Sequence, residues 1–236
     1  LDPAEPRLAL PVRPPAGYHD LVVRVAGHGV AREGRQRFIM APRTAYTVQE
    51  RIGDARVFGF WANLYAVRSA HNWGFGDLGD LRALMRWCGS AGGAFVGVNP
   101  LHAIPNRGLA ITPYSPSSRL YRNPLYLEVE VVPEWADSPA ARARCGDAAF
   151  AARLAQLRAA DAIDHGAVLD AKLPVLHELF AVFCAQRELA GNARSAAFAA
   201  FVAREGERLR DFATWETLAA HFAEARGEPA TEWRRW

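Results

Sequence analysis

The sequence predicts an α/β fold that contains a parallel sheet and is preceded by part of a small β domain. Two nearly continuous apolar runs, at residues 57–67 and 94–98, are typical of strands buried on both faces. Between these runs, apolar side chains recur at helical spacing, at Leu81, Leu84, Met85 and Cys88. Asp77 or Asp80 can cap this helix, and the glycines at 92–93 end it. Strand, helix and strand in this order form a βαβ unit, whose two strands are parallel.

Residues 1–56 carry a different pattern, which predicts the tail of a β domain. After a proline-rich start, apolar residues alternate along the chain at Leu21, Val23 and Val25. The Gly-His-Gly sequence at 27–29 indicates a turn, and two short apolar runs at 37–41 and 45–48 predict further strands. We therefore expect a domain boundary between residues 56 and 57.

The last part of the chain is expected to be helical. Residues 125–131 predict one more short strand, and beyond them apolar residues recur in three stripes at helical spacing. The stripes are Val175, Leu176, Leu179, Phe180 and Phe183; Phe198, Phe201, Val202 and Leu209; and Phe212, Trp215, Leu218 and Phe222. Packing in a hydrophobic core explains these stripes without any ligand.

The composition is that of an ordinary globular protein of 236 residues, with 50% hydrophobic and 22% charged residues. No window approaches the roughly 18 uninterrupted apolar residues of a membrane span, so no membrane association is expected. The absence of a charged and then apolar leader favours a cytoplasmic location. Because the chain starts at Leu1 and stops at Trp236 without a terminating signal, we expect a piece of a longer protein.

Charge and metal-ligand patterns argue against several classes of function. The net charge of +3 is small, and the basic residues, of which only Lys172 is a lysine, are scattered among acids. A nucleic-acid partner is therefore not expected, because it would need a basic patch interleaved with aromatic rings. Cys88, Cys145 and Cys184 form neither a disulfide framework nor a metal pattern, and we expect reduced, buried thiols. The seven histidines are dispersed, so no metal site is expected.

One motif matches a nucleotide-binding fingerprint and has to be weighed against it. Residues 74–79, Gly-Phe-Gly-Asp-Leu-Gly, fit the pattern G-x-G-x-x-G between a strand and a helix. The fingerprint, however, places its first glycine directly after the strand, whereas six residues intervene here. Asp77 would also repel phosphates, and Asn99 and Pro100 stand where the ribose-binding acid belongs. We interpret the glycines as a tight turn, with Asp77 and Asp80 as capping residues.

A long polar loop follows the second expected strand, at the end of the sheet where α/β barrels build their active sites. Prolines at 100, 105, 113, 116 and 124 restrict its backbone. Its hydrogen-bonding side chains are Asn99, His102, Asn106, Arg107, Thr112, Tyr114, Ser115, Ser117, Ser118, Arg119, Tyr121 and Asn123. Neutral polar groups beside tyrosine rings suit a sugar polymer, whose hydroxyls need partners and whose C–H faces pack on rings. The alternative, a loop whose polar groups satisfy one another, stays open here.

Five segments stand out by their order, spacing and proline content. They are LYAVRS at 64–69, NWGFGDLGDL at 72–81, GVNPLHA at 97–103, TPYSPSSR at 112–119 and NPLY at 123–126. Together they closely resemble the bacterial 4-alpha-glucanotransferase family, the amylomaltases or disproportionating enzymes of the α-amylase clan. In addition, residues 15–19 resemble the end of that family's N-terminal β domain, and the helices from about 171 to 223 resemble an insertion after the first two barrel strands.

The resemblance implies a (β/α)8 TIM barrel, of which only the first strands are present here. Residues 57–236 would form the first part of this catalytic barrel and would include a helical insertion at about 138–225. Family members transfer α-1,4-glucan segments between malto-oligosaccharides by a retaining double displacement, with two carboxylates about 5 Å apart. No cofactor or metal is needed. Because those carboxylates lie on later strands and no acid here matches them, we assign no catalytic residue and expect the isolated chain to be inactive.

The resemblance also implies a set of substrate-binding residues. Tyr114 corresponds to a tyrosine that stacks on the donor sugar, and Thr112 replaces a commoner serine while keeping its hydroxyl. Asn99 and His102 either contact the substrate or fix the loop, and Asn123 completes the set. The expected partners are malto-oligosaccharides and the missing remainder of the barrel. Two alternatives stay open: a hydrolase or debranching relative of the same clan, and a noncatalytic glucan-binding fragment.

Overall fold

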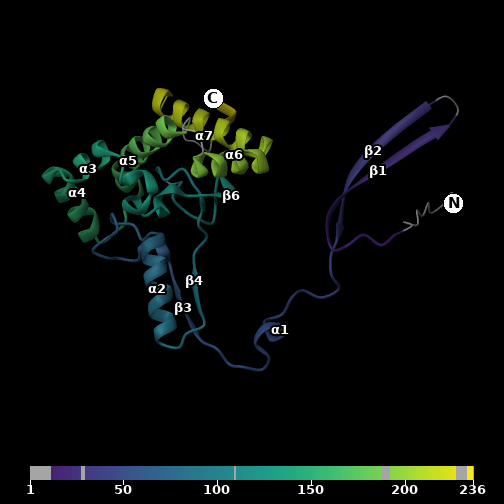
Figure 1. The fold of residues 1–236 in the computed structure, drawn as a ribbon, viewed down its shortest axis with the longest axis horizontal. Coiled ribbons are helices and arrows are strands. Elements are labelled where there is room, and N and C mark those ends of the chain that lie inside the picture. The colour runs from purple at the N-terminus through teal and green to yellow at the C-terminus, as the bar shows by residue number, and fades with distance from the viewer. Residues whose placement is uncertain (1–11, 28–29, 109, 188–191, 227–232, 236) are drawn as a thin grey trace. The chain divides into compact units, whose positions relative to one another are not determined.

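The computed structural model describes residues 12–27, 30–108, 110–187, 192–226 and 233–235 (Figure 1). The chain divides into two compact units, Leu1–Arg56 and Val57–Trp236. The first contains a β-hairpin and a short helix, and the second contains the remaining strands and helices. In the described part of the chain, no helix combines the length and the apolar character that crossing a membrane requires.

The first unit is built around two long antiparallel strands, β1 (Gly17–Gly27) and β2 (Val30–Met40). Residues 28–29 of the expected turn lie outside the described residues. The strand expected at 45–48 is wrong, because Thr47 instead begins the short helix α1 (Val48–Ile52). Within the described residues, this segment pairs with no strand that could hold it extended.

The expected βαβ unit is confirmed in the second unit. Strands β3 (Gly59–Ala62) and β4 (Phe95–Val98) pair in parallel, and helix α2 (Leu78–Ser90) connects them and lies beside them (Figure 1). The first strand is shorter than the apolar run at 57–67. It ends because the backbone N–H of Leu64 donates to the side chain of Asn99, and the chain then forms the 3-10 turn η1 (Leu64–Ala66).

The expectation that both strands are buried on both faces is wrong. The side chains of Trp61 on β3 and Phe95 on β4 are 72% and 53% exposed. Among the described residues, no third strand pairs with either of them. The run of apolar residues therefore reflects a surface that the described chain leaves open.

The segment after the long loop is a series of 3-10 turns rather than the short strand expected at 125–131. These turns are η2 (Pro124–Tyr126), η3 (Val129–Val131) and η4 (Pro133–Trp135). Asn123 caps the first turn through the N–H of Leu125, and the fixed φ of Pro124 suits a helical start. Local capping thus overrides the alternating apolar pattern.

The expected helices follow these turns. They are α3 (Pro139–Cys145), α4 (Ala148–Ala159), α5 (His165–Gln186), α6 (Ala193–Glu205) and α7 (Glu207–Arg226). Side chains of Ser138, Asp147, Asp164 and Asn192 cap the first four of them. Core packing explains the stripe on α5 only in part, because Val175 and Leu179 are buried whereas Phe180 is 55% exposed.

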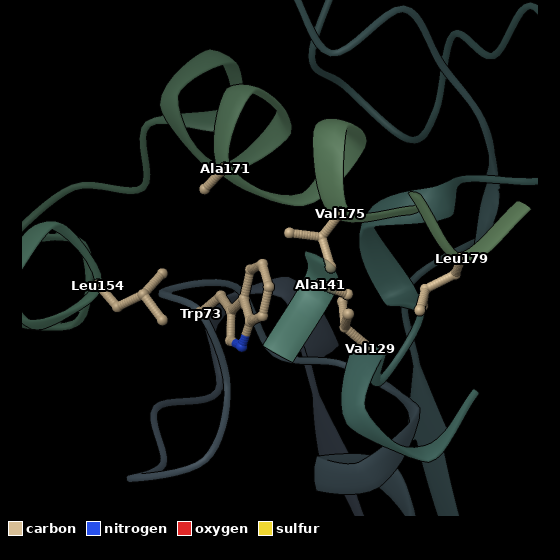
Figure 2. Packing of buried hydrophobic residues seen from close by; sticks show 7 residues of the cluster. All are labelled: Trp73, Val129, Ala141, Leu154, Ala171, Val175 and Leu179. Atoms are coloured by element: carbon tan, nitrogen blue, oxygen red, sulfur yellow. The ribbon is translucent and has the colours of Figure 1, made fainter. Parts of the chain in front are cut away.

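The main hydrophobic core joins the turn before α2 to these helices (Figure 2). Its buried members are Trp73, Val129, Ala141, Leu154, Ala171, Val175 and Leu179. The indole of Trp73 lies among the helical side chains, and its Nε1 donates to Glu130 at 2.9 Å. A second core consists of Leu64, Phe75, Leu125, Tyr126, Val168 and Leu169, and Leu101 at the start of the long loop packs against it. Both cores therefore fix the segments that carry the candidate site.

Candidate functional site

The turn at residues 72–80 is a helix cap, as the sequence predicts. The Oδ1 atom of Asp77 accepts from the N–H groups of Gly79 and Asp80, at 2.9 and 3.2 Å. Asp80 returns the bond by accepting from the Asp77 N–H at 2.9 Å, which completes a capping box. Asn72 also donates to Asp80, at 2.8 Å. The two acids thus satisfy the start of α2, and neither is free for a phosphate-binding role.

The three glycines of the G-x-G-x-x-G motif allow parts of the protein to approach one another. A Cβ atom on Gly74, whose φ is +84°, would lie 2.7 Å from the carbonyl oxygen of Leu157. A Cβ on Gly76 would overlap the carbonyl oxygen of Leu64, and one on Gly79 would meet the carboxylate of Glu128. The space above the glycines is therefore filled by protein, which argues against the dinucleotide interpretation.

Arg68 and Trp73 have structural roles, as expected. The guanidinium of Arg68 donates to the carbonyl oxygens of Gly74 at 2.8 Å and Ala160 at 3.0 Å. These bonds tie the turn to the end of α4. From the other side, Arg158 donates to the carbonyl oxygen of Asn72 at 2.6 Å. The turn is consequently held to the helices by both packing and hydrogen bonds.

The only lysine of the chain joins helix α5 to the segment that follows the long loop. The Nζ atom of Lys172 is fully buried and donates to the carbonyl oxygens of Leu125 and Leu127, at 2.7 and 2.8 Å. The carboxylate of Asp77 lies 3.9 Å from it. Burial lowers the pKa of Lys172 to about 8, although Asp77 acts in the opposite direction. Burial likewise raises the pKa of Asp77 despite the nearby ammonium, so desolvation is the larger effect for both partners.

Asn99 fixes the base of the loop. Its side chain is 1% exposed, and its Oδ1 accepts from the Leu64 N–H at 2.7 Å. Its Nδ2 donates to the hydroxyl of Tyr126 at 2.8 Å and to the Pro100 carbonyl oxygen at 2.9 Å. Both amide hydrogens are thus used within the chain. Of the two roles left open by the sequence, the geometry favours fixing the loop over contacting a sugar.

Asn123 is also buried and bonds to Asn106 instead of presenting its amide to solvent. The two side chains donate to one another, at 2.9 and 2.8 Å, and each is 2% exposed. Asn106 follows β5 (His102–Ala103) and Asn123 follows β6 (Ser118–Arg122), and these two strands pair in antiparallel fashion. The long loop therefore forms a hairpin-like excursion between residues 102 and 123. The amide pair of Asn106 and Asn123 holds this excursion closed.

The ring of Tyr114 is presented to solvent near the tip of this excursion. Its side chain is 63% exposed, whereas the neighbouring Pro113 is buried. The residues form a turn in which the Ser115 N–H donates to the Thr112 carbonyl oxygen at 3.3 Å. Thr112 is itself exposed, and its hydroxyl oxygen accepts from the Tyr114 N–H at 3.4 Å. A buried proline beside an exposed aromatic ring makes a site that needs little ordering on binding.

His102 lies in β5 and is half-buried. Among the described residues, its Nδ1 atom has no hydrogen-bond partner. Of the five residues that the resemblance singles out, Tyr114 and Thr112 are therefore exposed, His102 keeps an unpaired nitrogen, and Asn99 and Asn123 are buried. In the described part of the chain, no three His, Cys, Asp or Glu side chains gather to hold a metal ion.

Comparison with known proteins decides the family. A model described as 4-alpha-glucanotransferase matches residues 62–236. This chain belongs to the 4-alpha-glucanotransferase family. The match begins in β3 and includes the capping turn, the loop with Tyr114 and all five helices from α3 to α7.

Curated 4-alpha-glucanotransferases extend this result over most of the chain. Those of Mycobacterium bovis and Mycobacterium tuberculosis are 36% identical over 245 residues, which cover 98% of this chain. That of Haemophilus influenzae is 33% identical over 199 residues, which cover 83% of this chain. The chain spans only 30% of the length of the mycobacterial relatives and 27% of the Haemophilus relative.

A solved structure shows the same fold in this part of the molecule. The crystal structure of amylomaltase from Corynebacterium glutamicum matches with a TM-score of 0.72 at 30% sequence identity. The match covers 92% of this glucanotransferase-family chain and 29% of that chain. The described fold is therefore a partial α/β fold shared with an amylomaltase.

Sequence reasoning alone did not identify Lys172 as part of the loop's support. Its four-carbon stem is buried in the interior, and the carbonyl groups that it contacts lie more than forty residues away. The available signal was compositional, because a single lysine stands among 28 basic residues. The one lysine in such an arginine-rich chain is a candidate for a specific buried contact.

Proposed function

We propose that this chain is the N-terminal part of a 4-alpha-glucanotransferase that transfers α-1,4-glucan segments between malto-oligosaccharides. The observation that supports this most directly is the exposed ring of Tyr114. Its loop is held by the buried amide pair of Asn106 and Asn123. The proposed substrates are maltodextrins and glycogen-derived glucans, handled in the cytoplasm. Residues 99–123 would form the wall that faces the glucan.

The roles of the five candidate residues follow from their positions. Tyr114 stacks on the C–H face of a glucose unit, and the Thr112 hydroxyl bonds to a sugar hydroxyl beside it. The unpaired Nδ1 of His102 is buried, so His102 would act on the loop or a neighbouring group rather than through this atom on the substrate. Asn99 and Asn123 act indirectly, because their amides are occupied in holding the loop.

The chemistry of transfer would need groups beyond this set. Retaining transfer requires a carboxylate nucleophile and an acid/base carboxyl about 5 Å apart. The acids near the loop have other roles, since Asp77 and Asp80 cap α2 and Glu128 pairs with Arg82 at 2.8 Å. We therefore propose that this chain binds and orients the glucan but has no transfer activity by itself.

We further propose that β3 and β4 are the first two strands of a (β/α)8 barrel in residues 57–236, with residues 138–225 as a helical insertion and residues 1–56 as the tail of a β domain. The exposed Trp61 and Phe95 support this, since later strands and helices of a barrel would cover such side chains. The remaining part of the barrel would then be the partner of this surface.

A binding experiment tests the proposal. Maltoheptaose is titrated against the chain and against Tyr114→Ala, followed by calorimetry. Loss of the stacked ring should weaken binding about tenfold. Tyr46→Ala is the matched control, because Tyr46 is a 70% exposed tyrosine in the first unit and should leave the affinity unchanged. Equal affinities for wild type and Tyr114→Ala would contradict the proposal.

Incubation with maltotriose tests the assignment of chemistry. The expected result is no product from the chain alone. Glucose together with longer maltodextrins would contradict the proposed absence of catalytic carboxylates. Shorter products without longer ones would indicate a hydrolase instead.

A further inference from the structure

Helix α7 is attached to the loop that carries Tyr114, although the two segments lie about a hundred residues apart in the sequence. The Ser117 hydroxyl donates to Oε1 of Glu216 at 2.8 Å. The rings of Tyr121 and Phe212 stack, with centroids 4.4 Å apart and planes inclined by 23°. Since Phe212 and Glu216 are four residues apart on α7, they share one face of that helix.

Ser117 links α7 to two parts of the loop. Its backbone N–H donates to the Ala103 carbonyl oxygen in β5 at 2.9 Å, and its hydroxyl lies 3.1 Å from the same oxygen. A hydroxyl has only one hydrogen, and the carboxylate at 2.8 Å is the stronger acceptor. The backbone therefore holds Ser117 to β5, and the side chain holds it to Glu216.

The surroundings of the Glu216 carboxylate favour its hydrogen bond with Ser117. It is partly buried, and burial raises its pKa, while the hydrogen bond from Ser117 acts in the opposite direction. Among the described residues, no basic side chain forms an ion pair with it. In the described part of the chain, its side-chain hydrogen-bond partner is Ser117 of the loop.

The position of Ser117 in turn limits the position of Tyr114. Only two residues separate them, one of which is Pro116, and three residues span at most about 10 Å. The residue on the other side, Pro113, is buried. An anchor at Ser117 therefore restricts the range over which the exposed ring can move.

We propose that Glu216 is a positioning residue, which holds the Tyr114 ring in place for glucan binding through its hydrogen bond with Ser117. This inference rests on the proposed function, because it assumes that Tyr114 contacts the glucan. It also gives helix α7, which lies outside the loop, a role in glucan affinity.

The test compares maltoheptaose binding to the whole 236-residue chain and to variants of α7. Glu216→Ala should weaken binding about fivefold, and Glu216→Gln, which keeps an acceptor for the hydroxyl, should recover part of it. Glu224→Ala is the matched control, because Glu224 is exposed on the same helix and should bind as the wild type does. Ser117→Ala removes the same hydrogen bond from the other side and should weaken binding as Glu216→Ala does.

A double variant separates positioning from general loss of structure. When Tyr114 is already replaced by alanine, Glu216→Ala should cause no further loss of affinity, because there is no ring left to position. A further fivefold loss in that background would overturn the inference. So would unchanged binding by both Glu216→Ala and Ser117→Ala while Tyr114→Ala weakens it. No effect of Tyr114→Ala itself would instead contradict the proposed function.

Hydrogen exchange gives a result that does not depend on glucan. In Glu216→Ala the amides of residues 112–121 should exchange at least threefold faster than in the wild type, because the anchor of the loop is lost. Glu224→Ala should leave their exchange unchanged. Unaltered exchange in Glu216→Ala would overturn the inference whatever the binding data show.

Discussion

The side-chain amides of Asn106 and Asn123 donate to one another, with Nδ2 to Oδ1 distances of 2.9 and 2.8 Å. Each amide also bonds to the backbone two residues away, since Asn106 donates to the Ile104 carbonyl oxygen and Asn123 accepts from the Leu125 N–H. This pair closes the base of the excursion that carries Tyr114. It accounts for the order of a loop that contains little regular secondary structure.

Removal of one member of this pair should be costly. Asn123→Ala removes the donor to the buried Oδ1 of Asn106 and the acceptor for the N–H of Leu125, while Asn106 keeps its bond to the Ile104 carbonyl oxygen. We therefore expect a loss of about 2–3 kcal/mol in the free energy of unfolding. Urea unfolding measures it. Asn63→Ala is the control, because Asn63 is exposed and its side chain makes no cap hydrogen bond. If Asn123→Ala lowered the free energy of unfolding no more than the control does, the amide pair would not contribute to stability.

Two glycine substitutions should have opposite effects on stability. Gly76→Ala places a Cβ atom on the carbonyl oxygen of Leu64, so the backbone must shift and we expect a loss of about 2 kcal/mol or more. Gly89→Ala meets open space inside α2, where alanine is the better helix former, and should gain about 0.5–1 kcal/mol. Thermal unfolding of both variants measures this. If Gly76→Ala were as stable as wild type, the close approach to Leu64 would be wrong.

The buried ammonium of Lys172 should make stability depend on alkaline pH. Its folded pKa of about 8 lies below the unfolded value near 10.5, so the unfolded chain binds the extra proton between these values. Stability from this group should therefore rise with pH across that window, by about 1.4 kcal/mol per pH unit at most. The free energy of unfolding is compared between wild type and Lys172→Met. Groups that both proteins share, such as Cys145, whose contribution to stability falls with pH, cancel in the difference.

The Lys172→Met variant makes the outcome decisive. It should be less stable than wild type at pH 9, because the carbonyl oxygens of Leu125 and Leu127 lose their donor. The difference between the two proteins should widen from pH 8 to pH 10. A difference that stays constant with pH would mean that Lys172 titrates normally in the folded chain.

The three thiols should react at very different rates. Cys184 is exposed, Cys88 is buried, and burial raises the pKa of Cys145 to about 11, with Glu130 and Glu178 adding to the effect. A disulfide reagent at pH 8 should therefore modify one thiol quickly and the other two only after unfolding, since the thiolate is the reactive form. Two fast equivalents would contradict the raised pKa of the half-buried Cys145 or the burial of Cys88. The expectation of three buried thiols is corrected by the exposure of Cys184.

The parts of the fold that depend on neighbouring residues could be predicted from the sequence. The spacing of Asp77 and Asp80 is enough to identify the cap of α2, and the apolar period is enough to place the helix between two parallel strands. A phosphate-binding role for the glycines at 74–79 could also be rejected from the sequence, because the negative charge of Asp77 lies within the same six residues.

The parts that depend on distant contacts could not be predicted. The segment at 125–131 alternates like a strand, but Asn123 and Lys172 hold its first carbonyl and amide groups in a turn. The strand at 57–67 ends early because Asn99, which lies 35 residues beyond Leu64, takes a backbone donor. Likewise, no local pattern pairs Ser117 with Glu216.

The burial of Lys172 protects its amine from reagents that modify lysine side chains. Since it is the single lysine among 28 basic residues and is fully buried, no lysine amine is open to acylating reagents or cross-linkers in the native state. An acyl group on that nitrogen would remove the charge and block the bonds to Leu125 and Leu127. Acylation of this side chain would therefore mark only molecules in which α5 had already separated from the segment that follows the loop, and would prevent the two from packing together again.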